Sequence, residues 1–422
     1  MFFFLIYRII SNILFLPITF YLIFRILKRK ETWRSFKEKL GFYDIKRPPG
    51  KLIWINASSI GESLSTISLI KYIKKNFPEH LILMTTGTIT SERVISKRAQ
   101  KLLIHQFAPL DLGISVEKFL KHWKPDIAIF VESEIWPNLL NSTTNKSIKF
   151  ILLNARISEK SFTKWKKVHL ISSSIFKKIN LCFAQDDESK LRFKELGVKS
   201  IFTYGNLKFS SDKLPVNVNE YEVFKKFLIN KKVVTLSSSH PNEELMIIKI
   251  IKEIRKKISD IFLIIVPRHI NRSNMIERLL IKEQLNFKIR SKSQQIDKQT
   301  NYYLADTYGE LGLFYKLSSI VLIGGSFVKK GGQNPIEPSN FNCSVIFGPY
   351  MSNFQPTVNL FVKNKAAIQI KNLNELEKNI LKILGDYNLK TSLSINLTKV
   401  CESEREDNKK LFKKINKIIS NI

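Results

Sequence analysis

Short apolar runs alternate with longer amphipathic stretches along most of the chain, from about residue 51 onward. The runs have the length of strands, and the stretches between them repeat apolar residues at helical spacing. Strands that alternate with helices predict parallel sheets wound by right-handed crossovers. The expected strands form two sets: Leu52–Asn56, Leu81–Thr85, Ile127–Val131, Phe150–Leu153, Leu181–Ala184 and Ile201–Tyr204, then Val233–Ser237, Ile261–Val266, Ile320–Ile323 and Val345–Phe347. The expected helices include Ser63–Phe77, Val116–His122, Glu243–Ile258 and Leu373–Leu384.

A polar segment separates the two sets of strands. Residues Ser210–Glu222 read SSDKLPVNVNEYE, which is typical of an interdomain linker. The length of 422 residues also exceeds one ordinary domain of roughly 150–200 residues. We therefore expect an α/β protein with two doubly wound, Rossmann-like domains, at residues 31–212 and 213–422, and an interdomain cleft.

The amino-terminal segment, residues 1–30, has a different pattern and predicts a membrane-anchor helix. Between Arg8 and Arg25 lie 16 uncharged residues, which as a helix measure about 24 Å, against about 30 Å for the hydrocarbon core. Either the two arginines snorkel and the helix spans, or the helix lies in the interface; Pro17 would kink it. We expect a single anchor. Basic residues follow at once, from Lys28 to Lys39, so the positive-inside rule places the remaining chain in the cytoplasm.

Composition narrows the class of protein. The chain is 44% hydrophobic, which allows two cores, and its 69 Lys and Arg exceed its 36 Asp and Glu, giving +33. This charge favours anionic partners, although a compositional bias toward Lys, Ile, Asn and Phe also accounts for part of it. Three widely spaced cysteines show neither a disulfide framework nor a zinc pattern, and six scattered histidines show no metal motif. The basic residues are spread along the whole chain, without an RNA- or DNA-binding signature, so we expect no nucleic acid partner.

Candidate chemistry gathers after the strands, where open α/β sheets bind their ligands. In the first set Glu62, Glu132, Arg156 and Lys208 follow strands, and in the second His240, Arg268, Gly324–Gly325, Asn334 and Glu337 do so. Each has a purely structural alternative. Glu62 has the position of a first-turn acid that the helix dipole favours, Glu132 could pair with Arg156 or Lys208, and the Gly pair could form a tight turn. Their joint placement at strand ends in both domains favours a site.

Eight ordered strings at these positions resemble one family: NASSIGES, FVESEIWPNLL, NARIS, YGNLKF, VPRH, TYGELGLFYKLSSIVLIGGSFV, GGQNPIEP and FGPYMSNF. They resemble the 3-deoxy-D-manno-octulosonic acid (Kdo) transferases of lipopolysaccharide and lipid A biosynthesis. The resemblance runs from about Phe36 to about Phe354. One position departs from it, because the family commonly has His where Gln333 stands in GGQN. Gln can donate a hydrogen bond but cannot titrate.

The resemblance implies an enzyme of the GT-B type, with an amino-terminal acceptor-binding domain and a carboxyl-terminal nucleotide-sugar-binding domain. Its implied reaction is inverting transfer of Kdo from CMP-Kdo to a lipid A precursor of the lipid IVA type at the cytoplasmic face of the bacterial inner membrane. It implies Glu62 as the general base and Glu132 and Lys208 as transition-state stabilisers. The residues implied to hold CMP are Pro267, Arg268, Gly309, Glu310, Leu311, Asn334, Pro335, Ile336 and Glu337.

The chemistry of these residue types agrees with that assignment. A sugar hydroxyl is a poor nucleophile, so a carboxylate such as Glu62 must take its proton. Arg268 offers a bidentate fork to the leaving phosphate, and we expect Gly324–Gly325 to offer backbone N–H groups at a helix start. Glu337 could accept hydrogen bonds from ribose. Because basic residues can neutralise the charge, we expect no cofactor and no metal. Two other readings stay open: a GT-B enzyme that uses a UDP-sugar on a lipid-linked acceptor, and a basic nucleic-acid-binding protein. The number of Kdo residues transferred also stays open.

Overall fold

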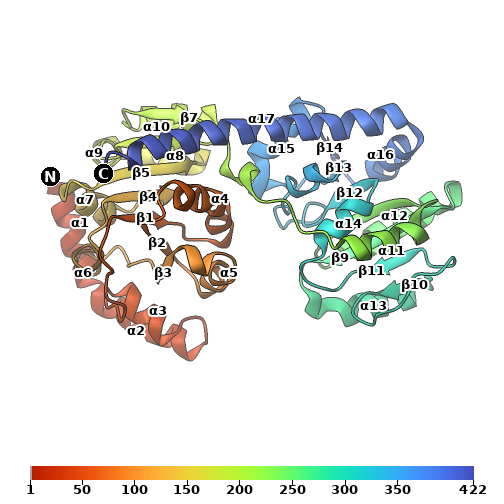
Figure 1. The fold of residues 1–422 in the computed structure, drawn as a ribbon, viewed down its shortest axis with the longest axis horizontal. Coiled ribbons are helices and arrows are strands. Elements are labelled where there is room, and N and C mark those ends of the chain that lie inside the picture. Colours follow the sequence, from red (N-terminus) through yellow and green to blue (C-terminus); the bar gives the residue numbers. More distant parts are fainter. Residues whose placement is uncertain (1) are drawn as a thin grey trace. The chain divides into compact units, whose positions relative to one another are not determined.

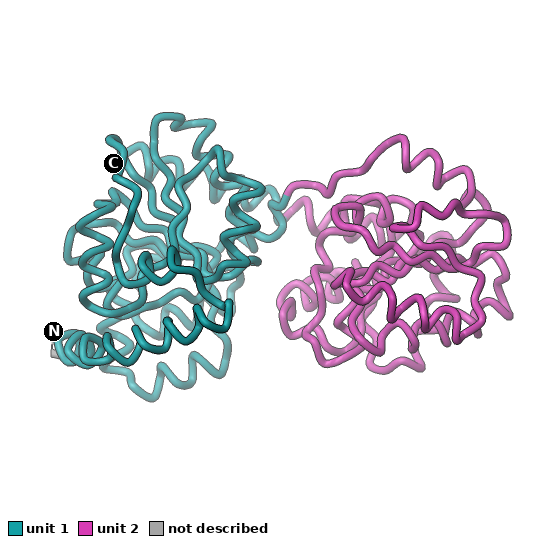
Figure 2. The backbone as a smooth tube through the Cα atoms, turned by 90° about the horizontal axis from the view of Figure 1, so that it is seen from below, with its two compact units in different colours: residues 1–211, 404–422 teal, residues 212–403 magenta. Residues whose placement is uncertain are grey.

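The computed structural model describes residues 2–422 and divides into two compact units (Figure 2). Unit 1 contains the chain up to Ser211 together with Glu404–Ile422, and unit 2 contains Asp212–Ser403. We had expected the second domain to run to residue 422, and the division differs because residues 404–422 pack with unit 1. Their apolar side chains Leu411, Phe412 and Ile415 are buried in a core cluster of that unit.

Unit 1 is built on a seven-stranded sheet in the order β3-β2-β1-β4-β5-β6-β7, and all its neighbouring strands are parallel (Figure 1). The expected strands of the first set are confirmed. One strand, β3, was not foreseen, because His105 and Gln106 interrupt its apolar pattern. The strands are β1 Leu52–Asn56, β2 Leu81–Thr86, β3 Ile104–Phe107, β4 Ile127–Val131, β5 Lys149–Ala155, β6 Leu181–Ala184 and β7 Ile201–Thr203.

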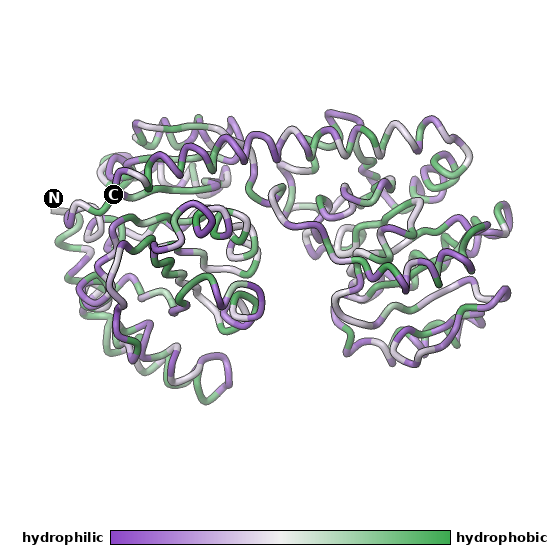
Figure 3. The backbone as a smooth tube through the Cα atoms, viewed as in Figure 1, coloured by the Kyte–Doolittle hydropathy of each residue, from purple (hydrophilic) through white to green (hydrophobic). Residues whose placement is uncertain are grey.

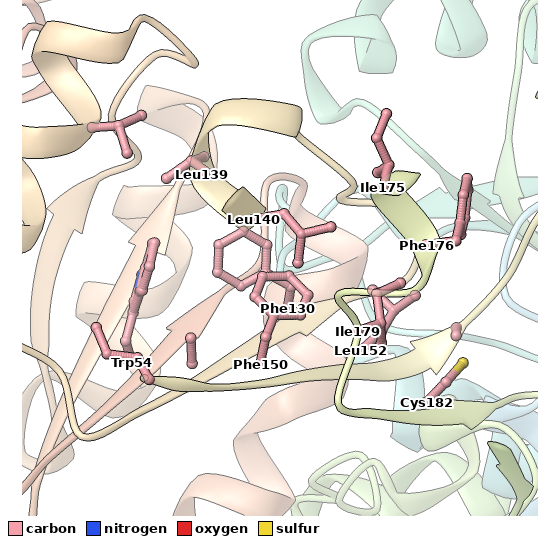
Figure 4. Packing of buried hydrophobic residues seen from close by; sticks show 14 of the residues in the cluster. Trp54, Phe130, Leu139, Leu140, Phe150, Leu152, Ile175, Phe176, Ile179 and Cys182 are labelled. Carbon is pink, nitrogen blue, oxygen red and sulfur yellow. The ribbon is translucent and has the colours of Figure 1, made fainter. Parts of the chain in front are cut away.

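Aromatic side chains fill one face of this sheet (Figure 4). The ring of Phe130 lies 4.7 Å from that of Trp54 and 4.6 Å from that of Phe150, and all three side chains are fully buried. Helices cover the sheet, and the expected helices Ser63–Phe77 and Val116–His122 are confirmed as α4 and α6. The helices of this unit beyond the amino-terminal pair are α3 Trp33–Lys39, α4 Ile60–Asn76, α5 Ile89–Ala99, α6 Gly113–Trp123, α7 Pro137–Asn145, α8 Glu159–Lys167, α9 His169–Phe176 and α10 Asp187–Glu195.

Unit 2 repeats the architecture with a parallel seven-stranded sheet in the order β10-β11-β9-β8-β12-β13-β14. The expected strands and helices of the second set are confirmed, but the expected linker is shorter than predicted, because α11 begins at Val218. The strands are β8 Lys232–Ser239, β9 Ile261–Pro267, β10 Phe287–Ile289, β11 Tyr302–Leu304, β12 Ile320–Ile323, β13 Ser344–Phe347 and β14 Ile368–Gln369. The helices are α11 Val218–Leu228, α12 Glu243–Lys257, α13 Ser273–Lys282, α14 Leu311–Leu317, α15 Gln355–Lys363, α16 Asn374–Gly385 and α17 Tyr387–Ile419, whose last turns belong to unit 1.

The amino-terminal segment forms two helices, α1 Phe2–Ile13 and α2 Phe15–Leu27, bent by 48° relative to each other. In a continuous helix the ring of Pro17 would clash with the carbonyl group of Ile13, four residues earlier, and this accounts for the break between the helices. No helix in the described part of the chain is by itself long and apolar enough to cross a membrane, whereas α1 and α2 together have the necessary length and composition. Their hydropathy can be followed in Figure 3.

Candidate active site

Glu62 lies in the first turn of α4, just after β1. Ser59 caps the helix, since its hydroxyl accepts the Glu62 backbone N–H at 3.3 Å. The same hydroxyl donates to one Glu62 carboxylate oxygen at 2.7 Å, and the Ser58 N–H donates to the other at 2.9 Å. Burial raises the pKa of Glu62, as do the nearby carboxylates of Glu132 and Glu134. Glu62 is thus both a first-turn acid and a carboxylate with a fixed orientation and a raised proton affinity.

Glu132 follows β4 and forms an ion pair with Lys208, whose Nζ lies 3.0 Å from its carboxylate. Of the two partners that the sequence offered, Lys208 is therefore the one found. Glu132 has a left-handed backbone with φ of 59°, held by its N–H bond to the Leu153 carbonyl at 2.9 Å. A positive φ is uncommon for Glu, and such conformations concentrate at functional sites. The loop after β4 thus holds this carboxylate in one position.

Lys208 is positioned by side-chain amides and by the carboxyl-terminal helix. It lies in the 3₁₀ turn Leu207–Ser210, where Asn206 Oδ1 accepts the Lys208 N–H at 3.0 Å and Asn154 Oδ1 accepts the Leu207 N–H at 3.0 Å.

From α17, the Glu404 carboxylate accepts the Asn206 N–H at 3.1 Å, and Asn408 Nδ2 donates to the Asn206 carbonyl at 3.0 Å. The last turns of α17 therefore support the turn that carries Lys208.

In unit 2 the segment expected to hold a phosphate begins where β9 ends. Pro267 is the last residue of β9 and pairs with Ser239 of β8, whose carbonyl accepts the Arg268 N–H at 3.0 Å. A buried ion pair supports this corner, since Arg272 lies 2.8 Å from Glu244, which in turn accepts the Ser239 hydroxyl at 2.6 Å. The sequence did not reveal Arg272 and Glu244, because nothing in their spacing distinguishes them from surface charges.

The expected segment Asn334–Glu337 makes a compact polar turn. Asn334 Oδ1 accepts the Ile336 N–H at 3.0 Å, and Asn334 Nδ2 donates to the Glu337 carboxylate at 3.2 Å. Pro335 stands between them, and the short 3₁₀ helix Glu337–Asn340 follows. The amide and the carboxylate therefore lie together, where they can contact a polar ligand.

The third expected segment, Gly309–Leu311, differs in what it can offer. The Glu310 carboxylate is engaged by Arg290 through two hydrogen bonds, of 3.0 and 2.6 Å, and it also accepts the Thr307 hydroxyl. Hydrogen bonding to Arg290 lowers the pKa of Glu310. Gly309 has a positive φ of 86° and an unobstructed Cα. Here backbone groups, and not the Glu310 carboxylate, are available to a ligand.

The expectation for Gly324–Gly325 is wrong. No helix begins at this turn in the described chain, and its backbone N–H groups already have partners within the protein. Glu243, a buried acid in the first turn of α12, accepts the Gly325 N–H at 2.7 Å and the Phe327 N–H at 3.0 Å, while the Ser237 carbonyl accepts the Gly324 N–H at 2.8 Å. A buried carboxylate therefore holds the turn in shape, and an anion cannot use the same N–H groups.

Gln333 stands beside His240. Its side-chain amide lies 3.0 Å from His240 Nε2, at hydrogen-bond distance. Burial lowers the pKa of His240, as do His269 and Arg268 nearby. The residue at position 333 thus orients a neutral histidine through a hydrogen bond that requires no titration.

Comparison with known proteins agrees with this arrangement. Residues 34–211 match the family model described as 3-deoxy-D-manno-octulosonic-acid transferase (kdotransferase). The chain is 39% identical to the 3-deoxy-D-manno-octulosonic acid transferase of Rickettsia bellii over 89% of this chain and 90% of that protein. It is 31% identical to the enzyme of the same name from Haemophilus influenzae over 79% of each.

The fold has solved counterparts. A glycosyltransferase from Rickettsia africae superposes with a TM-score of 0.58 at 14% identity, over 88% of this chain and 100% of that one. The expected α/β fold of the GT-B type is thereby confirmed. Together with the identity over most of both chains, these findings show that the chain belongs to the 3-deoxy-D-manno-octulosonic acid transferase family.

Proposed function

We propose that this enzyme transfers Kdo from CMP-Kdo to a lipid A precursor of the lipid IVA type, with inversion at the anomeric carbon. The observation that carries the proposal is the group of three residues in unit 1: a carboxylate of raised pKa, Glu62, in electrostatic contact with Glu132, which is itself paired with Lys208. Family membership supports Kdo as the sugar that is transferred. The proposal that CMP is the nucleotide rests on the resemblance of the unit 2 segments to the CMP-binding segments of the family.

In the proposed reaction Glu62 is the general base. The acceptor hydroxyl attacks the anomeric carbon while Glu62 takes its proton, and the bond from that carbon to the phosphate oxygen breaks, so that CMP leaves with the electron pair. The raised pKa of Glu62 suits this role, because a stronger base takes the proton more readily. The Ser58 and Ser59 hydrogen bonds fix the orientation of its carboxylate.

Charge that develops in the transition state is assigned to the Glu132–Lys208 pair. Lys208 balances either the sugar carboxylate or the departing phosphate, and Glu132 stabilises oxocarbenium-like charge and orients Lys208. A fixed pair is favourable here, because its dipole does not have to reorganise as the reaction proceeds. Arg268 takes the phosphate, and the Asn334–Glu337 turn contacts the ribose. These groups supply the charge neutralisation, so we propose that the reaction needs no metal.

The proposed location is the cytoplasmic side of the bacterial inner membrane, where a lipid-linked acceptor meets a soluble donor. The apolar helices α1 and α2 supply the means of attachment. The basic stretch from Lys28 to Lys30 is exposed and lies next to them, which favours the anionic cytoplasmic leaflet.

The testing experiment is a transfer assay on detergent-solubilised protein, with CMP-Kdo generated in situ, a lipid A precursor as acceptor, and mass spectrometry of the lipid. A mass increment of one or more Kdo residues is expected and would also give their number. Folded protein that gives no increment, beside a working control enzyme, would contradict the proposal. Transfer from a UDP-sugar under the same conditions would replace it by the rival GT-B reading.

A further inference from the structure

A polar cluster ties the amino-terminal helix to unit 1. The Tyr7 hydroxyl of α1 donates to the Asp111 carboxylate at 3.0 Å, and Ser11 Oγ of α1 accepts from Asn138 Nδ2 at 2.9 Å in a buried bond. Asp111 also accepts the N–H groups of Asn138 and Leu139 at 3.2 and 2.7 Å, which caps the first turn of α7. The same carboxylate thus binds a polar residue of α1 and the start of α7.

The docked face continues along α1 and α6. Asn12 Oδ1 accepts the Ile114 N–H at 3.1 Å, and Arg8 forms an ion pair of 3.7 Å with Glu117. The approach is close at Gly113, where an added Cβ would come within 2.7 Å of the Arg8 side chain. The four polar side chains of α1, those of Tyr7, Arg8, Ser11 and Asn12, therefore each contact a residue outside the helix.

The second helix is attached as well. Leu22 of α2 is buried in a small cluster with Leu40 and Leu112. After α2, the carboxylate of Glu31 is buried and forms ion pairs with Arg25 at 3.1 Å and with Lys39 at 2.7 Å. Both ends of the bent pair are thus fixed to the same unit, which leaves no free length of helix that could enter a bilayer end-on.

The opposite face of the pair is apolar and uncovered in the described structure. Six large apolar side chains of this face are between 50% and 78% exposed. Three lie one helical turn apart on α1, and three lie on α2: Leu5, Ile9, Ile13, Leu16, Phe20 and Leu27. Exposed Trp33 and the basic residues from Lys28 to Lys30 follow directly. An apolar face bordered by cations and an aromatic residue complements an anionic lipid surface, with the rings and ammonium groups at headgroup level.

We propose that α1 and α2 lie in the plane of an anionic phospholipid bilayer, with their apolar face in the headgroup and acyl boundary, and that neither helix crosses the membrane. A spanning arrangement would detach Tyr7, Ser11 and Asn12 from unit 1 and bury them in hydrocarbon, while Asp111 would lose its donor from α1. The in-plane arrangement keeps every one of these bonds. It rests on the membrane association proposed above and does not depend on the sugar transferred.

The arrangement also ties the membrane to the catalytic loop. Asp111 accepts from Tyr7 of α1 and from the first turn of α7, and α7 begins directly after the segment from Glu132 to Trp136, so the helix that lies on the membrane and the helix that follows the Glu132 loop share one carboxylate. We infer that the in-plane pair is a positioning device for the reaction of a lipid-linked acceptor.

Depth measurement by spin labelling tests the proposal. Single cysteines replace Leu5, Ile13, Phe20 and Leu27 in the full chain, and the three native cysteines are buried and give little background. Purified protein is added to vesicles of phosphatidylglycerol and phosphatidylethanolamine. If the helices lie in the plane of the membrane, no label should be deeper than about 10 Å. An impermeant nickel chelate outside the vesicles should then reach the labels at positions 5 and 27 equally. A label at Ser392, which is exposed on α17, serves as the aqueous control.

Two results would overturn the proposal. A label at Ile13 near the bilayer centre, about 15 Å deep, with only one of positions 5 and 27 reached from outside, would show a spanning helix. Spectra broadened by spin–spin interaction between molecules, with no label located in the bilayer, would show that a second copy of the chain covers the apolar face. Neither result depends on donor or acceptor, so failure here is distinguishable from failure of the transfer assay.

Matched variants extend the test. Phe20→Glu should weaken binding to anionic vesicles at least about tenfold, as loss of one buried aromatic side chain requires, while Met275→Glu, at an exposed apolar position on α13, should leave binding unchanged. Tyr7→Phe should raise the mobility of a label at Ile9 without altering one at Phe20. An unchanged Ile9 label would show that the Tyr7 bond does not hold α1.

Discussion

Lys208 Nζ lies 3.0 Å from the Glu132 carboxylate, although the two residues are 76 positions apart in the sequence and several elements lie between them. Glu132 reaches this position through a left-handed backbone, and Lys208 through a 3₁₀ turn supported by Asn206. Both side chains are mostly buried, so solvent screens their interaction weakly. The pair is therefore a fixed dipole whose carboxylate also acts on Glu62 electrostatically.

Glu62→Gln should lower turnover by at least about 10²-fold, because an amide cannot take the proton of the acceptor hydroxyl. CMP-Kdo should still bind, since the segments expected to hold CMP lie in unit 2. Single-turnover transfer and equilibrium binding of donor measure the two effects. Glu92→Gln, which replaces a carboxylate of α5, is the matched control and should keep near-normal turnover. Near-normal turnover of Glu62→Gln would remove the general-base assignment.

The pH dependence of kcat/KM should report the raised pKa of Glu62. A general base works only when deprotonated, so the rate should fall as the pH drops through that pKa, which burial places above the ordinary range for Glu. Glu134 adds a negative charge that raises the pKa further. Glu134→Gln should therefore move the acidic limb of the profile to lower pH. An acidic limb that stays in place would show that another group limits the rate.

Lys208→Met should lower turnover by about 10²-fold or more, as for other groups that stabilise developing charge. Glu132→Gln should also lower it, and the double variant should lose less than the sum of the two losses in activation free energy, because residues in one ion pair are coupled. A double-mutant cycle on kcat measures this coupling. Strictly additive losses would mean that the two residues act separately.

Glu243→Gln should destabilise unit 2 by about 1–3 kcal/mol, since a Gln side chain offers one acceptor where the turn presents two backbone N–H donors. The unfolding temperature of the variant measures this loss. Glu253→Gln is the control, because that carboxylate is exposed on the same helix and pairs with the exposed Lys256. A variant with unchanged stability would show that the turn holds its shape without Glu243.

Chelation should leave activity intact, since Lys208 and Arg268 supply the positive charge in the proposed reaction. Transfer is measured with excess EDTA and again after magnesium is added back. Activity abolished by EDTA and restored by magnesium would contradict the proposal that no metal takes part.

The fold followed from apolar patterning wherever strands were long and uniformly apolar, as at Ile127–Val131 and Ile261–Pro267. Four strands were not predicted: β3, β10, β11 and β14, each of two to four residues. Strand β3 contains His105 and Gln106, and β14 is two residues long, so neither stands out from a loop in the sequence.

The candidate site was predictable only in part. Strand ends indicated where Glu62, Glu132 and Lys208 would lie, but the pairing of Glu132 with Lys208 rather than Arg156 depends on tertiary placement. Glu243 looked like an ordinary first-turn acid, because its partners, Gly325 and Phe327, are more than 80 positions away. Asp111 gave no signal at all, for the same reason: its hydrogen bond to Tyr7 crosses 104 positions.

The support that α17 gives to the turn of Lys208 also affects how the molecule matures. Glu404 and Asn408 emerge from the ribosome only after the whole of unit 2. Domains generally fold as units during synthesis, but here unit 1 lacks the carboxylate and amide that hold Asn206 until residues 404–408 have been translated. A nascent chain can therefore complete unit 2 first, while the turn that carries Lys208 in unit 1 stays without its support. We therefore expect a chain terminated before Glu404 to lack the contacts that support the turn of Lys208, and to be inactive if Lys208 acts as proposed.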